Sequence, residues 1–251
     1  MTTFDSYRDR YENVAFTRGD DGVIEMRVHT DGGPLAWSAA AHRDLGPAFT
    51  DVAMDPENKV LVFSGTGDAF CDHIDHESFR ELFEHGPGLP RSEGRRLLHA
   101  VVDVDIPVVG VVNSPATVHA ELVVLSDIVI AADTACFADQ AHFANPPGTA
   151  PGDGVHVVWP YLLGPNRGRH FLLTGDEIGA EEALRLGVVA EVVPAADALE
   201  RGRAVARDLA ARPLTVLHQT REILIAPFRA LLNTTTLANG MARQGLSGTR
   251  L

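Results

Sequence analysis

Hydrophobic residues follow two different spacings in the first half of the chain. Residues 59–67 and 107–114 are near-continuous apolar runs, which are typical of strands buried on both faces of a parallel sheet. Residues 22–30 alternate in part and predict an earlier strand, which the DGGP sequence then ends in a turn. Between these strands, helical patterns of apolar residues cover residues 37–55, 76–85 and 91–104.

The second half of the chain favours helices more strongly. A short helix and a strand are expected within residues 120–133, an extension of the sheet at 134–139, and a strand at 188–193. Helices are expected over residues 152–164 and 166–175, and from Ala195 onward the pattern is almost wholly helical. Strands that alternate with helices, followed by helices alone, predict an α/β core over residues 1–194 and a C-terminal helical region over residues 195–251.

Composition and charge exclude several classes of protein. The 251 residues carry 34 acidic and 21 basic side chains, a net charge of −13, which repels nucleic acid and anionic membranes. The two cysteines, Cys71 and Cys136, do not indicate a disulfide framework or a paired-cysteine zinc site. No apolar run is long enough to span a membrane. The polar start lacks the features of a signal peptide, so a cytoplasmic location is expected.

Two segments are candidates for stabilising a negative charge on a substrate. Residues 67–79 and 112–122 each lead from a buried strand toward a helix. Backbone N–H groups left unpaired at such places can act as an oxyanion hole, where one donor contributes about 3 kcal/mol. Ordinary strand-to-helix turns explain the same pattern.

Three polar residues are candidates for acid–base chemistry. His119 lies at the start of a helix, His142 precedes a Pro/Gly-rich loop, and Asp153 follows it. A neutral imidazole accepts a proton from water when a carboxylate fixes its other nitrogen. The PPG sequence between His142 and Asp153 is a candidate bend that lets them meet. Helix capping is the alternative role for Asp153, and each histidine has an alternative as an ordinary interior or surface residue.

Two further features have competing explanations. The acidic and histidine-rich cluster at residues 72–77 suggests metal ligands, but no third or fourth ligand has a convincing spacing. A solvated helix start explains these charges equally well, so we expect no metal and no cofactor. Trp37 is expected either to pack in the core or to direct its indole N–H at a substrate carbonyl.

The order of motifs resembles the crotonase superfamily of enoyl-CoA hydratases and isomerases. The resemblance extends from about residue 20 to residue 200 and includes FCDHID, PVVGVVNSPA, SDIVIAAD, GTAPGDG and LTGDEIGAEEALRLGVV. It implies a spiral core of ββα units, C-terminal helices that form trimers or dimers of trimers, and two oxyanion N–H groups. By position, these donors are the N–H of Ile74 and one near Val118 or His119.

The sequence departs from the hydratases at their catalytic positions. His119 replaces an oxyanion-loop glycine, ADQAHF replaces the segment with the second catalytic glutamate, and Glu121 remains at the first glutamate position without a partner. LAW replaces the Asn-Ala-Leu of members that bind coenzyme A.

Nearly the whole chain up to about Pro194 resembles 6-oxocamphor hydrolase and related β-diketone hydrolases. The similar segments include SPATVHAEL, the AHF that contains His142, PGDGVHVVWP, NRGR, FLLTG and LAWSAAAH. That resemblance implies that His142 and Asp153 activate water, that His119 meets the carbonyl or enolate, and that Trp37 orients the substrate. The C-terminal glutamate of these hydrolases has no match here, and Asn239, Arg243 and Gln244 are the available replacements.

The sequence therefore predicts a cofactor-independent hydrolase that cleaves a carbon–carbon bond of a cyclic β-diketone in a retro-Claisen reaction. Two alternatives remain open. One is a hydratase or isomerase of an acyl-CoA ester, and the other is a non-catalytic binding protein with the same fold.

Overall fold

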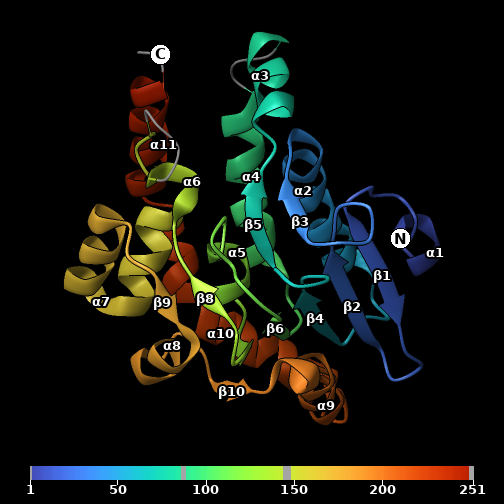
Figure 1. The fold of residues 1–251 in the computed structure, drawn as a ribbon. Helices are drawn as coiled ribbons and strands as arrows, with labels where there is room; N and C mark the ends of the chain where they lie inside the picture. Colours follow the sequence, from blue (N-terminus) through green and yellow to red (C-terminus); the bar gives the residue numbers. More distant parts are fainter. Residues whose placement is uncertain (1, 86–88, 144–147, 249–251) are drawn as a thin grey trace.

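The computed structural model describes residues 2–85, 89–143 and 148–248 (Figure 1). The strands are β1 (Val14–Arg18), β2 (Val23–Val28), β3 (Leu35–Trp37), β4 (Val60–Ser64), β5 (Cys71–Ile74), β6 (Val108–Val112), β7 (Ile128–Ala132), β8 (Cys136–Phe137), β9 (Ile178–Gly179) and β10 (Glu191–Val193). The α-helices are α1 (Phe4–Tyr7), α2 (Ala39–Met54), α3 (His76–His85), α4 (Leu89–Asp103), α5 (Glu121–Val124), α6 (Gln140–Phe143), α7 (Val155–Thr174), α8 (Ala180–Leu186), α9 (Ala198–Ala210), α10 (Leu214–Leu232) and α11 (Thr235–Gly248), and a 3₁₀ turn, η1, spans Ala195–Asp197.

A six-stranded sheet forms the centre of the molecule, with the strand order β1-β2-β4-β6-β7-β10. Only the β1–β2 pair is antiparallel. Every residue of β4 and β6 is buried, as their continuous apolar sequences predict, because helices cover both faces of a parallel sheet.

A smaller layer of strands accompanies the large sheet. β3 pairs with β5, and isolated bridges continue this layer from Cys71 to Ala116 and from Ala116 to Phe137. Along the chain, β2, β4, β6 and β7 are each followed by a segment of the second layer. The chain therefore winds as a spiral of ββα units, which confirms the expected fold class.

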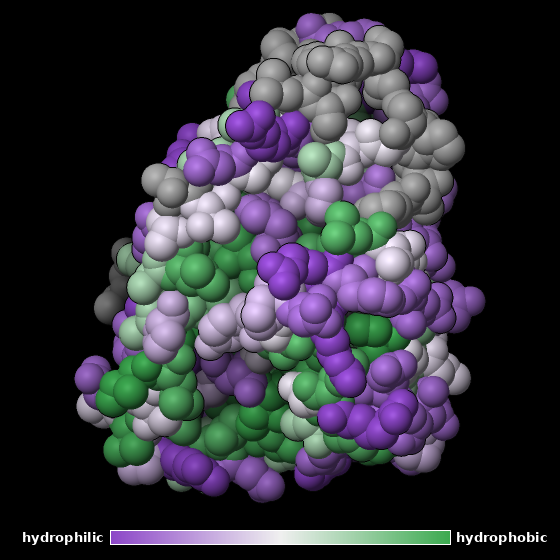
Figure 2. Space-filling model, turned by 90° about the vertical axis from the view of Figure 1, so that its left-hand side faces the viewer, coloured by the Kyte–Doolittle hydropathy of each residue, from purple (hydrophilic) through white to green (hydrophobic). Residues whose placement is uncertain are grey.

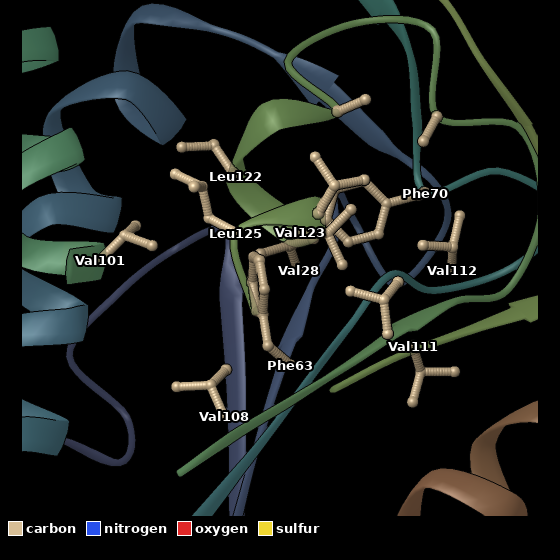
Figure 3. Packing of buried hydrophobic residues seen from close by; sticks show 14 of the residues in the cluster. Val28, Phe63, Phe70, Val101, Val108, Val111, Val112, Leu122, Val123 and Leu125 are labelled. Carbon is tan, nitrogen blue, oxygen red and sulfur yellow. The ribbon is translucent and has the colours of Figure 1, made fainter. Parts of the chain in front are cut away.

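The hydrophobic core fills the space between the sheet and helix α5. Phe63, Phe70, Leu122 and Val123 come together there from a strand, a loop and α5 (Figure 3). Gly110 of β6 allows this close approach, since a Cβ atom at this position would lie 2.8 Å from the Val123 carbonyl oxygen. A larger residue would push α5, and with it His119, away from the sheet.

The C-terminal helices pack on the core. A Cβ atom on Gly202 of α9 would lie 2.3 Å from Val111, so α9 contacts the sheet directly. Arg221 of α10 is buried and donates hydrogen bonds to Asp127 at 2.7 Å and to the Val102 carbonyl at 3.2 Å. The expected C-terminal helical region is present, while the domain boundary at residue 194 stays a prediction.

Several elements differ from the sequence-based expectation. β1, β3 and β5 were not predicted, and Trp37 ends β3 instead of starting a helix. Residues 134–139 contribute β8 to the second layer instead of extending the large sheet. By contrast, the two helices expected over residues 152–164 and 166–175 are confirmed as the two halves of α7, which are separated by a break at Gly164, where φ is 76°. Among the described helices, none has the length and apolar character needed to cross a membrane.

Candidate active site

The small strand layer positions both candidate histidines. Ala116 and Thr117 follow β6, and the Gln140 N–H donates to the Thr117 carbonyl at 2.9 Å. His119 lies two residues beyond Thr117, and His142 lies on α6 two residues beyond Gln140. The same backbone contact therefore fixes the starting points of the two segments that carry His119 and His142.

His142 is buried between two carboxylates. Its Nε2 lies 3.1 Å from Asp153 Oδ2, which is the contact that the sequence predicts. Its Nδ1 lies 2.6 Å from Asp139 Oδ1, a contact that the sequence did not reveal. Asp139 is buried and lies three residues before His142 at the start of α6, so one helical turn brings the two side chains together.

The chain returns to His142 before it enters α7. The Thr149 N–H donates to the His142 carbonyl at 3.3 Å, which brings the following turn back to the histidine. Residues 144–147, which contain most of the predicted PPG bend, lie outside the described residues. The capping role considered for Asp153 is wrong, because Gly154 is the N-cap of α7 and no side chain caps it. The Asp153 carboxylate instead faces His142.

Gln244 reaches the same pair from α11. Its Nε2 lies 3.0 Å from His142 Nε2 and donates to Asp153 Oδ2 at 3.3 Å. Of the three candidates for replacing the missing glutamate, Gln244 is the one that meets the histidine. Figure 1 shows α11 beside α6, which brings residues far apart in the sequence to one site.

Charge distribution in this cluster stabilises a protonated His142. Burial alone would lower its pKa, but the charge of Asp153 and the hydrogen bonds of both carboxylates raise the pKa to about 11. Burial would raise the pKa of Asp153, and the charge of His142 reverses this effect and holds the pKa well below its usual range. The two carboxylates therefore favour the imidazolium form of His142 at neutral pH.

His119 forms a second pair with a buried glutamate. Its Nδ1 lies 2.7 Å from Glu121 Oε1, so the glutamate at the first hydratase position is paired here with a histidine. Burial opposes protonation of His119, and the Glu121 carboxylate outweighs it and raises the pKa. The backbone at His119 has a φ of 51°, in the left-handed region. This conformation is uncommon for a residue with a side chain and often occurs at functional sites.

Trp37 is buried and packs against His119. The two ring centroids are 4.1 Å apart, and the planes are inclined by 36°. A cation is attracted to the face of an indole ring, so this contact favours the protonated form of His119. The charges of Asp153 and His142 also affect the pKa of His119, which places the two histidines in one site.

The structure corrects part of the predicted oxyanion hole. The Val118 N–H donates to the Cys71 carbonyl at 3.0 Å and is therefore occupied. Among the described residues, the His119 N–H has no such partner. The Asp75 N–H donates to the Trp37 carbonyl, so the preceding Ile74 N–H points to the opposite edge of β5, toward the Ala116 segment. Ile74 and His119 are the donors that this geometry supports.

The cluster at residues 72–77 is divided between β5 and the start of α3. Asp75 Oδ1 accepts a hydrogen bond from the Ser78 N–H at 3.2 Å, as a helix-capping aspartate does. Within the described parts of the chain, no group of three or more metal-binding side chains comes together.

The fold and the two buried His–carboxylate pairs define an enzyme of the crotonase superfamily. The chain belongs to the enoyl-CoA hydratase/isomerase family, whose model matches residues 18–244.

Three comparisons illustrate the range of its relatives. A β-diketone hydrolase from the cyanobacterium Anabaena sp. PCC 7120, solved with bound (S)-3-oxocyclohexyl acetic acid, is 36% identical, with 97% of each chain covered and a TM-score of 0.93. A candidate enoyl-CoA hydratase from Thermus thermophilus is 28% identical over 85% of this chain and 83% of its own length. An enoyl-CoA hydratase/isomerase from Mycobacterium paratuberculosis, 24% identical, has the same fold, with a TM-score of 0.87 and coverage of 95% and 94% of the two chains.

Proposed function

We propose that this enzyme hydrolyses a carbon–carbon bond of a cyclic β-diketone and releases a keto acid. The observation that carries the proposal is the buried His142, held between Asp139 and Asp153 with His119 in the same site. The similarity to the Anabaena β-diketone hydrolase over 97% of both chains supports it. The molecule bound to that hydrolase contains a ketone and a carboxylate, which are the two groups that cleavage of a β-diketone produces.

Water activation is the first step of the proposed reaction. Neutral His142 accepts a proton from water at Nε2, and the water oxygen forms a bond to one ring carbonyl carbon. The resulting imidazolium is stabilised by the two carboxylates. General-base assistance of this kind accelerates a reaction by about 100-fold to 10,000-fold.

Cleavage of the carbon–carbon bond follows. The tetrahedral intermediate collapses, the new carboxyl group forms, and the bonding electron pair moves to the central carbon and onto the second carbonyl oxygen. The N–H groups of Ile74 and His119 and the protonated ring of His119 stabilise this enolate oxygen. The proton that His142 took from water returns to the central carbon, and the new carboxylic acid releases its own proton to the solvent. The product is therefore the neutral ketone with a carboxylate, and His142 is neutral again.

Ring opening in heavy-oxygen water tests the proposal. Bicyclic and monocyclic β-diketones are incubated with the enzyme in H₂¹⁸O, and the products are analysed by mass spectrometry. We expect a keto acid with one ¹⁸O in the new carboxylate, and loss of most activity in His142→Ala. A product without ¹⁸O in that carboxylate, or no turnover of any such diketone, would contradict it.

An acyl-CoA hydratase or isomerase is the second candidate function. Glu121 favours it, since a buried glutamate remains at a position where the hydratases have a catalytic one. Its carboxylate is engaged by His119 at 2.7 Å, however, which reduces its availability as a base. Turnover of crotonyl-CoA that Glu121→Gln abolishes would favour this second function.

A further inference from the structure

The two sides of the His142 ring have different environments. The Asp139 side chain is 1% exposed and lies 2.6 Å from Nδ1. The Asp153 side chain is 21% exposed and lies 3.1 Å from Nε2. The Nδ1 side is therefore sealed inside the protein, whereas the Nε2 side borders the accessible part of the site.

The backbone around Asp139 is also held more firmly than the backbone around Asp153. The residues on either side of it are tied to the small strand layer, with the Ala138 N–H donating to the Ala116 carbonyl at 3.4 Å and the Gln140 N–H donating to Thr117 at 2.9 Å. Asp153 lies in a turn. Among the described residues, one oxygen of each carboxylate, Asp139 Oδ2 and Asp153 Oδ1, is buried without a hydrogen-bond partner. A buried carboxylate oxygen without a partner is costly unless water or a ligand completes it.

We propose that Asp139, and not Asp153, is the positioning residue that fixes the ring of His142. An ionised carboxylate only accepts hydrogen bonds. The 2.6 Å contact between Asp139 Oδ1 and His142 Nδ1 therefore requires a proton on Nδ1. This arrangement makes Nε2 the nitrogen that exchanges protons with water. Asp153 then lies on the reacting side of the ring, where its partly exposed carboxylate binds the water or the substrate.

Among the described residues, four groups affect the titration of the His142 ring. Asp139 contacts Nδ1, Asp153 and Gln244 contact Nε2, and His119 acts through its charge. Both carboxylates favour the imidazolium. Once the ring is neutral, they favour different tautomers, with Asp139 keeping the proton on Nδ1 and Asp153 keeping it on Nε2.

The tautomer of neutral His142 tests this assignment without any substrate. The enzyme is labelled with ¹⁵N-histidine, and two-bond ¹H–¹⁵N NMR spectra are recorded across the alkaline range for the wild type, Asp139→Asn and Asp153→Asn. The ring signals that are missing from the spectrum of His142→Gln are assigned to His142. Asp55→Asn serves as the control for loss of another buried carboxylate, since Asp55 contacts Tyr7 and Arg18.

In Asp153→Asn, we expect neutral His142 to carry its proton on Nδ1. In Asp139→Asn, we expect the proton on Nε2, and the control should match the wild type. A proton on Nε2 in Asp153→Asn would overturn the proposal, and that variant decides the question even if Asp139→Asn does not fold.

The kinetic consequence rests on the proposed function. With a diketone substrate, Asp139→Asn should lower kcat at least about 100-fold with little change in KM, because the wrong nitrogen carries the proton. An unchanged kcat would overturn the positioning role. Failure of the wild-type enzyme to cleave any diketone would contradict the proposed function, and the NMR result would still decide the role of Asp139.

Discussion

At the scale of single residues, the chemistry of the site depends on which carboxylate meets which ring nitrogen. The contact between His142 and Asp153 could be predicted from the sequence through the family resemblance. Asp139 was missed because residues 134–139 were expected to extend the sheet and the short helix α6 was not predicted. Its position three residues before His142 was the available signal. The second oxyanion donor stayed open between Val118 and His119, because a sequence does not show that the Val118 N–H donates to the Cys71 carbonyl.

The pH dependence of kcat/KM follows from the pKa of His142. Only neutral imidazole accepts a proton from water, and a raised pKa of about 11 keeps His142 protonated at neutral pH. We therefore expect kcat/KM for a β-diketone to rise with pH from about 6 to about 9. Asp153→Asn removes the strongest charge that opposes deprotonation, so its rise should move to lower pH. Asp51→Asn, which changes a carboxylate bonded to Tyr11, should keep the wild-type profile. A shift to higher pH in Asp153→Asn would contradict this prediction.

A substitution can separate the hydrogen-bonding role of the Trp37 indole N–H from the packing role of the Trp37 ring. Trp37→Phe keeps an aromatic ring against His119 but removes the N–H. If the N–H binds a substrate carbonyl, kcat/KM should fall about threefold to tenfold, the value of one neutral hydrogen bond. Trp159→Phe is the matched control, because its buried N–H has no partner among the described residues. Equal kinetics for Trp37→Phe and the wild type would leave Trp37 a packing role only.

At the scale of elements, sequence patterns were informative for long elements with one apolar face and for elements that are wholly apolar. β4 and β6 were predicted because every position is buried and nearly all are apolar. β3 and β5 have three and four residues, too few to show a reliable alternation. They nevertheless carry Trp37 and Ile74 to the site. The approach of α11 to Asp153 could not be predicted, since it depends on tertiary packing between segments distant in sequence.

The docking of α11 depends on a contact between two glycines. A Cβ atom on Gly152 would lie 2.1 Å from the Gly240 carbonyl oxygen, a distance that requires the backbone to move. Gly152→Ala should therefore displace α11, weaken the Gln244 contact, and lower the free energy of unfolding by about 1–3 kcal/mol.

Thermal and denaturant unfolding, together with diketone kinetics, measure both effects. Gly179→Ala is the control, because a Cβ atom on Gly179 would meet no neighbouring atom within 4 Å and its φ of −73° suits any residue. A Gly152→Ala enzyme with wild-type stability and activity would show that α11 docks without this close approach.

At the scale of the whole molecule, apolar side chains remain exposed on α7 and α10. Val216, Ile223 and Leu224 of α10 are 56%, 72% and 66% exposed, and Leu173 of α7 is 73% exposed. Figure 2 shows hydrophobic surface on the side of the molecule where α7 lies. Tyr161 of α7 contacts Phe228 of α10 with ring centroids 4.9 Å apart, so the two helices are packed together. Exposed apolar surface of this kind is typical of interfaces between subunits.

We propose that α10 contacts further copies of the chain in a trimer or a dimer of trimers, as the family resemblance implies. Burying one large apolar side chain contributes about 1.5–3 kcal/mol, so charges at Ile223 and Leu224 should disrupt the assembly. Light scattering after size-exclusion chromatography should show an oligomer for the wild type and smaller species for Ile223→Glu/Leu224→Lys. Met54→Glu, which places a charge at an exposed position on α2, should leave the oligomer intact. A monomeric wild type, or an unchanged mass for the double variant, would contradict an interface on α10.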